Sequence, residues 1–291
     1  MPDLGKTLII GAGYVGRPLA EQLRHQGNEV HVWVRSEESA AELRHPGFPQ
    51  IYVGSVGDEV AWDAVKERYD VVIHCASSGR GGPSAYSDVF LNGMRRVVER
   101  QPAARKLFVS STSVYGQTSG EVVTEESPAE PFTDTGIILR TVEEMALKAG
   151  TIIVRSSGIY GFDRAVLWKK FKRGEAVIEG DGSRWINQIE QVDLMMALMW
   201  LAERGQPGEI YNATDDTPVM QRDYYAWCAE MLMRPLPPHG PVNTQRKRGL
   251  TNKRVSNAKL KRCTPWSPVY PSFREGLKWE AERAQSGRLD G

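Results

Sequence analysis

The chain has 291 residues, of which 41% are hydrophobic and 25% charged, a composition that supports a sizeable core and excludes disordered and collagen-like chains. Lys and Arg number 37 against 36 Asp and Glu, so the formal net charge of +1 gives no general attraction for nucleic acids or membrane surfaces. The length fits one large domain, or a large domain with a smaller lobe.

The three cysteines, Cys75, Cys228 and Cys263, are far apart and match neither a disulfide framework nor a zinc-ligand spacing. We therefore expect a reducing, cytoplasmic compartment. The longest apolar stretch, residues 194–202, is about half as long as the roughly 20 residues that a membrane-spanning helix needs. We expect a core helix there and no membrane partner.

Short apolar stretches predict strands, and amphipathic stretches between them predict helices. The predicted strands are residues 7–10, 29–34, 50–54, 70–76, 105–111 and 151–157. The predicted helices are residues 17–26, 58–68, 87–100, 140–148 and 192–203. Apolar strands separated by helices indicate an α/β fold with a doubly wound parallel sheet, which binds ligands at the carboxyl ends of its strands.

A glycine-rich string, GAGYVG, follows the first predicted strand and opens the first predicted helix. Gly11 permits the tight turn, Gly13 lets the backbone approach a pyrophosphate, and Gly16 allows close packing of helix and strand. With Tyr14 and Val15, these glycines place backbone amides at a helix N-terminus, which predicts a dinucleotide site. The alternative is a glycine-rich turn that binds no ligand.

The end of the second predicted strand bears on the choice between NAD and NADP. Val34 stands where an acid would accept hydrogen bonds from a ribose 2′-hydroxyl, and Arg35 and Ser36 follow it. A guanidinium suits a phosphate, so we expect NADP(H) to be preferred, with NAD(H) as the alternative. Arg35 is otherwise an exposed loop residue.

Residues 245–254 form a locally basic segment. A nucleic-acid patch is one interpretation and a solvated surface segment is the other. The neutral charge of the whole chain favours the surface segment, so we expect no nucleic-acid partner.

Further strings follow the glycine loop in the chain: HCAS at 74–77, SSTSVYG at 110–116, RSSGIYG at 155–161, IYNATDD at 210–216 and VSNAKL at 255–260. In this order they resemble the extended and atypical short-chain dehydrogenase/reductase superfamily, specifically its NAD(P)-dependent epimerase/dehydratase group. The resemblance covers almost the whole chain.

The resemblance implies a Rossmann domain, residues 1–155 plus about 187–212, that binds the nucleotide. It implies a smaller α+β lobe, about 156–186 plus 213–291, that binds the substrate. It also implies cofactor contacts beyond the glycine loop, from Ala76, Ser77, Asn92 and Ser110.

Members of this superfamily use a Ser or Thr with a Tyr and a Lys spaced four apart on one helix. The resemblance places the catalytic serine at Ser111, with Ser113 beside it. It places Gly136 at the tyrosine position and Arg140 at the lysine position, and the region contains no Tyr-x-x-x-Lys. Gly136 has no proton to transfer, whereas Arg140 can still hold a ribose hydroxyl.

Another residue would then have to carry the proton. Tyr115 is the nearest candidate and Tyr160 the second, the alternative for each being a packed ring that does not titrate. His74 is a third, for which a buried, hydrogen-bonded ring is the favoured interpretation. Tyr160 also stands with Ser111 and Ser113 as a candidate substrate residue, and Arg164 suits an anionic group unless it forms a surface salt bridge.

These observations favour an NAD(P)-dependent oxidoreductase, epimerase or dehydratase whose small-molecule substrate is a nucleotide sugar or a sugar phosphate. The alternative is a dinucleotide-binding redox sensor or regulator that has lost turnover. The glycine loop without the Tyr and Lys is the pattern that this alternative requires, whereas Ser111 and the second lobe favour the enzyme. The resemblance is compatible with a homodimer, although the sequence does not decide the oligomeric state.

Overall fold

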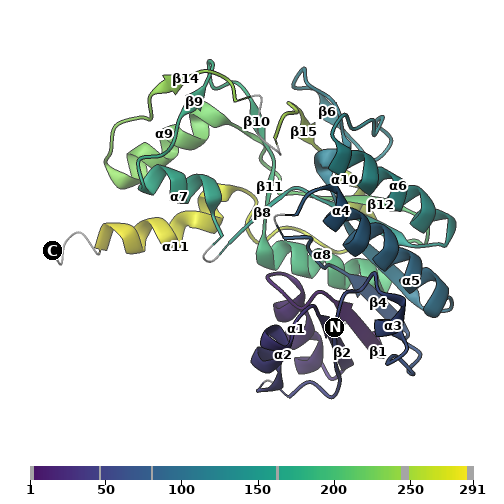
Figure 1. Cartoon of the computed structure of the whole chain (residues 1–291). Helices are drawn as coiled ribbons and strands as arrows, with labels where there is room; N and C mark the ends of the chain where they lie inside the picture. The colour runs from purple at the N-terminus through teal and green to yellow at the C-terminus, as the bar shows by residue number, and fades with distance from the viewer. Residues whose placement is uncertain (1–2, 46, 80, 162–163, 244–248, 287–291) are drawn as a thin grey trace.

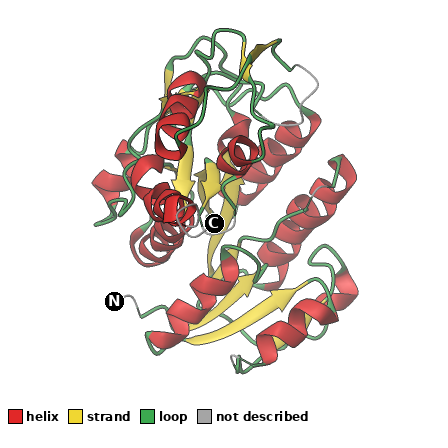
Figure 2. Ribbon diagram, turned by 90° about the vertical axis from the view of Figure 1, so that its left-hand side faces the viewer, coloured by secondary structure: helices red, strands yellow, loops and turns green. Residues whose placement is uncertain are grey.

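A seven-stranded parallel sheet forms the centre of the molecule (Figures 1 and 2). The computed structural model describes residues 3–45, 47–79, 81–161, 164–243 and 249–286. The strands of this sheet are β1 (Lys6–Ile10), β2 (Glu29–Val34), β3 (Ile51–Val53), β4 (Val71–His74), β5 (Arg105–Ser111), β7 (Ile152–Ser156) and β12 (Ile210–Ala213). Their spatial order is β12-β7-β5-β4-β1-β2-β3, and every neighbouring pair is parallel.

Helices cover both faces of the sheet. The α-helices α1 (Gly16–His25), α2 (Glu37–Arg44) and α8 (Gln191–Arg204) pack on one face. The other face carries α3 (Glu59–Trp62), α4 (Pro83–Tyr86), the π-helical turn η1 (Ser87–Asn92), α5 (Gly93–Arg100) and α6 (Asp134–Lys148). Because side chains alternate along a strand, Ile9 packs with the first set whereas Leu8 and Ile10 pack with the second.

A second, smaller lobe lies beside the carboxyl ends of the strands (Figure 1). Its helices α7 (Val166–Lys172), α9 (Gln221–Leu232) and α11 (Phe273–Ser286) share a core that includes Trp168, Tyr224 and Phe273. Its paired short strands are β9 (Ile178–Glu179) with β14 (His239–Gly240), and β10 (Trp185–Ile186) with β13 (Val219–Met220).

Short pairings join the lobe to the sheet. They are β8 (Gly158–Tyr160) with β11 (Gln188–Glu190), and β6 (Val122–Val123) with β15 (Arg254–Val255), which is followed by α10 (Ala258–Cys263). The chain crosses to the lobe after β7 and returns to supply α8 and β12 to the sheet before it enters the lobe again.

The doubly wound α/β sheet predicted from the sequence is confirmed, and the predicted strands all lie in it. Three helices differ from the prediction. The helix expected at 58–68 ends at Trp62, since the amides of Asp63 and Val65 bond to carbonyls three residues back. The helix expected at 87–100 begins as η1, and the one expected at 140–148 begins earlier, at Asp134, where Thr133 caps it.

The sheet order places the crevice for a ligand. β1 is flanked by β2 on one side and by β4 on the other, so the connections leaving β1 and β4 diverge to opposite faces. Such a topological switch point leaves a crevice at the carboxyl ends of the strands. None of the described helices is long and apolar enough to cross a membrane.

Candidate active site

A cavity of about 710 Å³ runs from the glycine loop, past the carboxyl ends of β4, β5 and β7, to the second lobe. Its charged lining residues, among those that the structure describes, are Arg35, Arg164, Arg184 and Lys253. All four are cationic, and no described carboxylate lines the cavity. The cavity therefore suits an anionic ligand although the whole chain is nearly neutral.

The glycine loop has the geometry of a pyrophosphate cradle. Gly11 has φ +93°, and a Cβ there would lie 2.2 Å from the Cα of Ala76. A Cβ on Gly16 would lie 2.2 Å from the Gly11 carbonyl oxygen, whereas a Cβ on Gly13 would meet nothing within 4 Å. The first turn of α1 contains no acidic residue, and the N-cap residue Val15 makes no side-chain hydrogen bond to the helix. The loop therefore fits an anionic group at the helix N-terminus.

At the end of β2, Val34, Arg35 and Ser39 line the cavity. Ser36 has another role: its hydroxyl caps α2 by accepting a hydrogen bond from the Ser39 amide at 3.4 Å. Ser36 does not itself line the cavity, so Ser39 stands where the sequence analysis placed Ser36.

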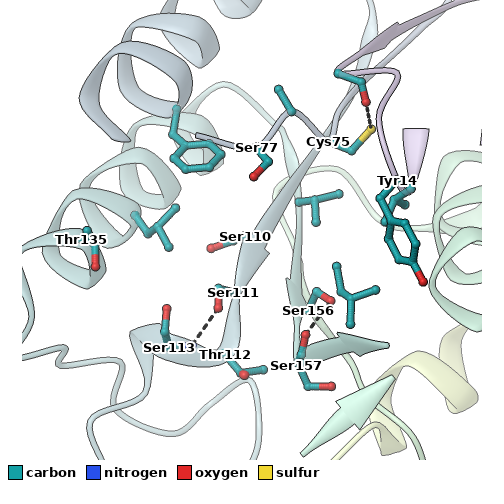
Figure 3. Close-up of a pocket in the computed structure, with 18 of the residues that line it drawn as sticks. Tyr14, Cys75, Ser77, Ser110, Ser111, Thr112, Ser113, Thr135, Ser156 and Ser157 are labelled. Carbon is teal, nitrogen blue, oxygen red and sulfur yellow. Dashed lines mark hydrogen bonds between the residues drawn. The ribbon is translucent and has the colours of Figure 1, made fainter. Parts of the chain in front are cut away.

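A row of hydroxyl groups lies where β5 ends (Figure 3). Ser110, Ser111, Thr112 and Ser113 all line the cavity. The Ser111 hydroxyl accepts a hydrogen bond from the Ser113 amide at 3.1 Å, which shapes the short helical turn η2 (Thr112–Val114). The structure thus brings the predicted Ser111 and Ser113 together at one end of the cavity.

A buried ion pair holds this end of β5. The Ser110 hydroxyl donates to a carboxylate oxygen of Glu143 at 2.7 Å, and Arg155 donates to the same carboxylate at 3.0 and 2.7 Å. Glu143 is fully buried and the Arg155 side chain is 1% exposed. Removing either Glu143 or Arg155 would leave the other as a buried, uncompensated charge, so the ion pair holds both residues in place. Its carboxylate in turn fixes the Ser110 hydroxyl that bonds to it.

In helix α6, the residues that line the cavity are not the two that the family resemblance places at the Tyr and Lys positions. Thr135 and Leu139, spaced four apart on α6, line it. Gly136 and Arg140 do not line it, and Arg140 instead pairs with Glu143 at 3.4 Å and Glu144 at 3.3 Å. The structure therefore places Arg140 away from the site expected for a ribose-binding residue, and the cavity face of α6 carries neither a Tyr nor a Lys.

The residues predicted as proton carriers have structural partners. Tyr115 is fully buried, does not line the cavity, and donates to Asn212 Oδ1 at 2.9 Å. Tyr160 lines the cavity but donates to the Ser272 carbonyl at 3.3 Å, and burial raises the pKa of both phenols. His74 is fully buried and donates from Nε2 to the Val89 carbonyl at 3.0 Å, as the favoured interpretation expects.

The basic segment is not simply a solvated surface. Residues 244–248 lie outside the part of the chain that the structure describes, but Lys253 lines the cavity and is 5% exposed. Its Nζ donates to the Tyr115 carbonyl at 3.0 Å and to Thr251 Oγ1 at 2.5 Å. Burial lowers the pKa of Lys253 to about 8. The interpretation of this segment as solvated surface is therefore wrong for Lys253.

Most of the other predicted residues line the cavity as expected. Ala76 and Ser77 follow β4 there, and Arg164 stacks its guanidinium 4.8 Å from the centre of the Tyr14 ring. Asn92 lies in η1 with its Cβ near Gly57 and does not line the cavity.

Two residues that line the cavity each have a buried side-chain oxygen without a hydrogen-bond partner in the described part of the chain. These oxygens are Ser157 Oγ and Gln188 Oε1. Ser157 falls within the string RSSGIYG, although the sequence analysis gave it no role, whereas Gln188, Thr135, Leu139 and Lys253 belong to no motif that would have marked them as site residues. The described residues also include no cluster of His, Cys, Asp or Glu that could hold a metal ion.

Curated proteins are similar to this chain in sequence over part of their length. The chain is 27% identical over 234 residues to 4-hydroxy-2-methyl-3-oxo-4-farnesyl-3,4-dihydroquinoline-1-oxide ketoreductase of Stigmatella aurantiaca, a match covering 74% of the chain and 69% of that protein. It is 27% identical over 180 residues to UDP-glucose 4-epimerase of Streptomyces lividans, covering 56% of the chain and 54% of that protein. The chain thus spans about half the length of the epimerase.

Solved structures share the whole fold. A structure described as an NAD-dependent epimerase/dehydratase of Methylobacillus flagellatus is 26% identical, with a TM-score of 0.79 over 97% of this chain and 100% of that one. The dTDP-glucose 4,6-dehydratase of Bacillus anthracis, solved in complex with NAD, has a TM-score of 0.79 at 17% identity over 97% of each chain. The model of the NAD dependent epimerase/dehydratase family matches residues 7–214, so the chain belongs to that family.

Proposed function

We propose that the protein is an NAD(P)-dependent oxidoreductase of the epimerase/dehydratase type that acts on a nucleotide sugar or a sugar phosphate. One observation carries this proposal: a single cavity joins the pyrophosphate cradle to a row of hydroxyls, and its charged lining residues are all cationic. A dinucleotide and a phosphorylated sugar are both anionic, so one electropositive cavity suits both.

The residues at the first end fit the dinucleotide. Gly11, Gly13 and the first turn of α1 would hold its pyrophosphate, and Arg35 with Ser39 would hold a ribose 2′-phosphate. When bound, a nicotinamide dinucleotide supplies the hydride acceptor or donor. We infer a preference for NADP(H) because Arg35 lines the cavity and none of the described carboxylates lines it to bind a free 2′-hydroxyl.

The residues at the second end fit a phosphorylated sugar. Ser111 and Ser113 would bond to sugar hydroxyls, and Ser110 is held by Glu143 beside them. Arg164 and Arg184 enter the cavity from the second lobe and would bind phosphate oxygens. UDP-glucose 4-epimerase, whose substrate carries such a diphosphate, is among the relatives that support this assignment.

The cofactor preference is tested by replacing the guanidinium. Arg35→Ala should raise the Kd for NADPH about tenfold or more, since charge-assisted hydrogen bonds contribute about 1.5–3 kcal/mol, and should leave the Kd for NADH nearly unchanged. Arg44→Ala is the matched control, because Arg44 lies on α2 in an exposed ion pair with Glu37 outside the cavity. Tighter binding of NADH than of NADPH by the wild-type protein would contradict the preference.

A second candidate function rests on the cavity face of α6. Thr135 and Leu139 lack the acidity and the charge of the Tyr and Lys that the family resemblance leads one to expect, which suits a redox sensor that binds the dinucleotide without turnover. Incubation with NADP⁺ or NADPH and a panel of nucleotide sugars and sugar phosphates separates the two functions. Product formation supports the enzyme, whereas tight NADPH binding with no turnover of any compound supports the sensor.

A further inference from the structure

We propose that Lys253 is the residue that exchanges a proton with the substrate hydroxyl. This inference rests on the proposed oxidoreductase function and gives that function the proton carrier that α6 lacks. Lys253 lines the cavity and directly precedes β15 in the chain. In sequence it is far from α6, the helix where the family resemblance places the Tyr and Lys.

Its position relative to the hydroxyl row supports this role. The Lys253 amine donates to the carbonyl of Tyr115, the residue that ends η2, and η2 begins directly after Ser111. Ser111, Ser113 and Lys253 all line the same cavity. A substrate hydroxyl held by Ser111 would therefore lie at the end of the cavity that also holds this amine.

The amine is anchored, and it keeps a hydrogen available. Thr251 Oγ1 and the Tyr115 carbonyl accept two of the three hydrogens of the ammonium group within the described structure. The backbone is also fixed, because Asn187 donates to the Lys253 carbonyl at 2.9 Å and accepts from the Val255 amide at 2.7 Å. The third hydrogen can therefore point to a ligand without rearrangement of the segment.

Cys75, Tyr160 and the arginines, which also line the cavity, are poorly suited to proton exchange. Burial raises the pKa of the Cys75 thiol to about 12, and this thiol already donates to the Gly11 carbonyl at 3.5 Å. Burial also raises the pKa of Tyr160, whose hydroxyl is bonded to the Ser272 carbonyl. The cavity arginines stay protonated at working pH.

The surroundings of Lys253 bring its pKa close to physiological pH. Burial disfavours the ammonium form and lowers its pKa to about 8, while the charge of Glu121, ahead of β6, opposes this decrease. The other charged side chains that the structure describes on the cavity wall, Arg35, Arg164 and Arg184, are cationic and give the ammonium form no anionic partner. An amine with such a pKa can both accept and return a proton near physiological pH.

The step balances in both directions. Oxidation of a substrate carbinol breaks its O–H and C–H bonds: the proton passes to the neutral Lys253 amine, and the hydrogen on carbon leaves with two electrons to the oxidised dinucleotide. A carbonyl group forms on the substrate. In the reverse direction the Lys253 ammonium returns the proton to the carbonyl oxygen as the reduced dinucleotide delivers the hydride.

Two substitutions of Lys253 distinguish the loss of proton exchange from the loss of the positive charge. Lys253→Met keeps most of the side-chain volume, and Lys253→Arg keeps the charge and the donors but cannot exchange a proton. With UDP-glucose and NADP⁺ as probes, both variants should lose 10²- to 10⁴-fold in kcat, the usual loss for a general acid or base, at nearly unchanged Kd for NADPH. Lys259→Met is the matched control, because Lys259 pairs with Glu209 outside the cavity. Thermal unfolding verifies that each variant folds.

A titration gives a readout that does not depend on turnover. The 15Nζ resonance that disappears in Lys253→Arg should titrate near pH 8 and should shift when UDP-glucose is added with NADP⁺. Wild-type kcat/KM for oxidation should rise with pH up to about 8 and then level, because the neutral amine is the base.

Two results would overturn the proposal: an amine that titrates above about 10 in the folded protein, or an Arg variant that retains wild-type kcat. Either result would leave the oxidoreductase function standing. The absence of both NADPH and NADH binding to the wild-type protein would instead contradict that function itself.

Discussion

His74 shows how a single residue of the HCAS string takes its role from its surroundings. It ends β4 with its ring centroid 5.6 Å from that of Phe108 and 6.2 Å from that of Phe90. Burial in this apolar environment lowers the pKa of His74 to about 4. The imidazole is therefore neutral in the folded protein at physiological pH and serves packing rather than proton transfer.

The lowered pKa predicts a loss of stability in mild acid. Between pH 6.5 and 4 the unfolded chain binds a proton on His74 that the folded protein excludes, so the free energy of unfolding falls as the pH falls, by up to about 3 kcal/mol. His74→Gln removes the titrating group and should remove this part of the pH dependence. Urea unfolding at several values from pH 7 to 4.5 measures it.

The control for this prediction is the exposed His25, since His25→Gln should leave the wild-type pH dependence in place. Comparing variants with the wild type cancels the contributions of the buried acids, such as Asp215. Identical curves for wild type and His74→Gln would contradict the assignment of a neutral, buried imidazole.

At the scale of the element, the glycine loop was well predicted because its constraint is local. The turn between β1 and α1 needs a positive φ at Gly11 and space at Gly16, and both requirements are visible in the spacing GAGYVG. Helix α6, which the family resemblance marks as the catalytic helix, was predicted less well. Each residue turns a helix by about 100°, so a one-residue difference between Gly136 and Thr135 decides which side chains line the cavity.

The glycine loop allows a matched pair of substitutions. Gly11→Ala should lower the free energy of unfolding by about 1–3 kcal/mol, because the new methyl group overlaps Ala76 and the backbone has φ +93°. Gly13→Ala should change that free energy by less than about 0.5 kcal/mol. It should nevertheless weaken NADPH binding about tenfold or more, because its methyl group enters the open space of the cradle.

Urea unfolding and calorimetric titration with NADPH measure the two effects separately. Undiminished NADPH binding by Gly13→Ala would place the pyrophosphate elsewhere. Normal stability of Gly11→Ala would show that the turn relaxes more readily than the contact with Ala76 implies.

At the scale of the whole molecule, the cavity is a joint product of the sheet and the second lobe. Arg35 and the glycine loop come from the sheet, whereas Arg164, Arg184 and Lys253 come from the lobe or from the segment that joins it to β15. A ligand that spans the cavity binds only the assembled protein. Binding should therefore stabilise the fold.

NADPH at 100 times its Kd should raise the free energy of unfolding by about 2.7 kcal/mol, provided that it binds only the folded protein. Thermal unfolding with increasing NADPH measures this as a rise in Tm. UDP-glucose should raise Tm further in the presence of NADPH, because the proposed function places a nucleotide sugar at the other end of the same cavity. Arg35→Ala at the same NADPH concentration should show a smaller rise, and an unchanged Tm in the wild type would contradict the assigned site.

The sequence by itself determined the parallel sheet and the glycine loop, since each depends on short-range spacing or on apolar runs, and its family resemblance marked the serines at the end of β5. Only the tertiary structure decided which distant side chains share the cavity. It buried Tyr115 against Asn212, turned Arg140 away and brought Lys253 in from the far end of the chain. Burial and proximity depend on how the two lobes pack together, so residue spacing could not reveal that a lysine in a basic segment would lie in the cavity.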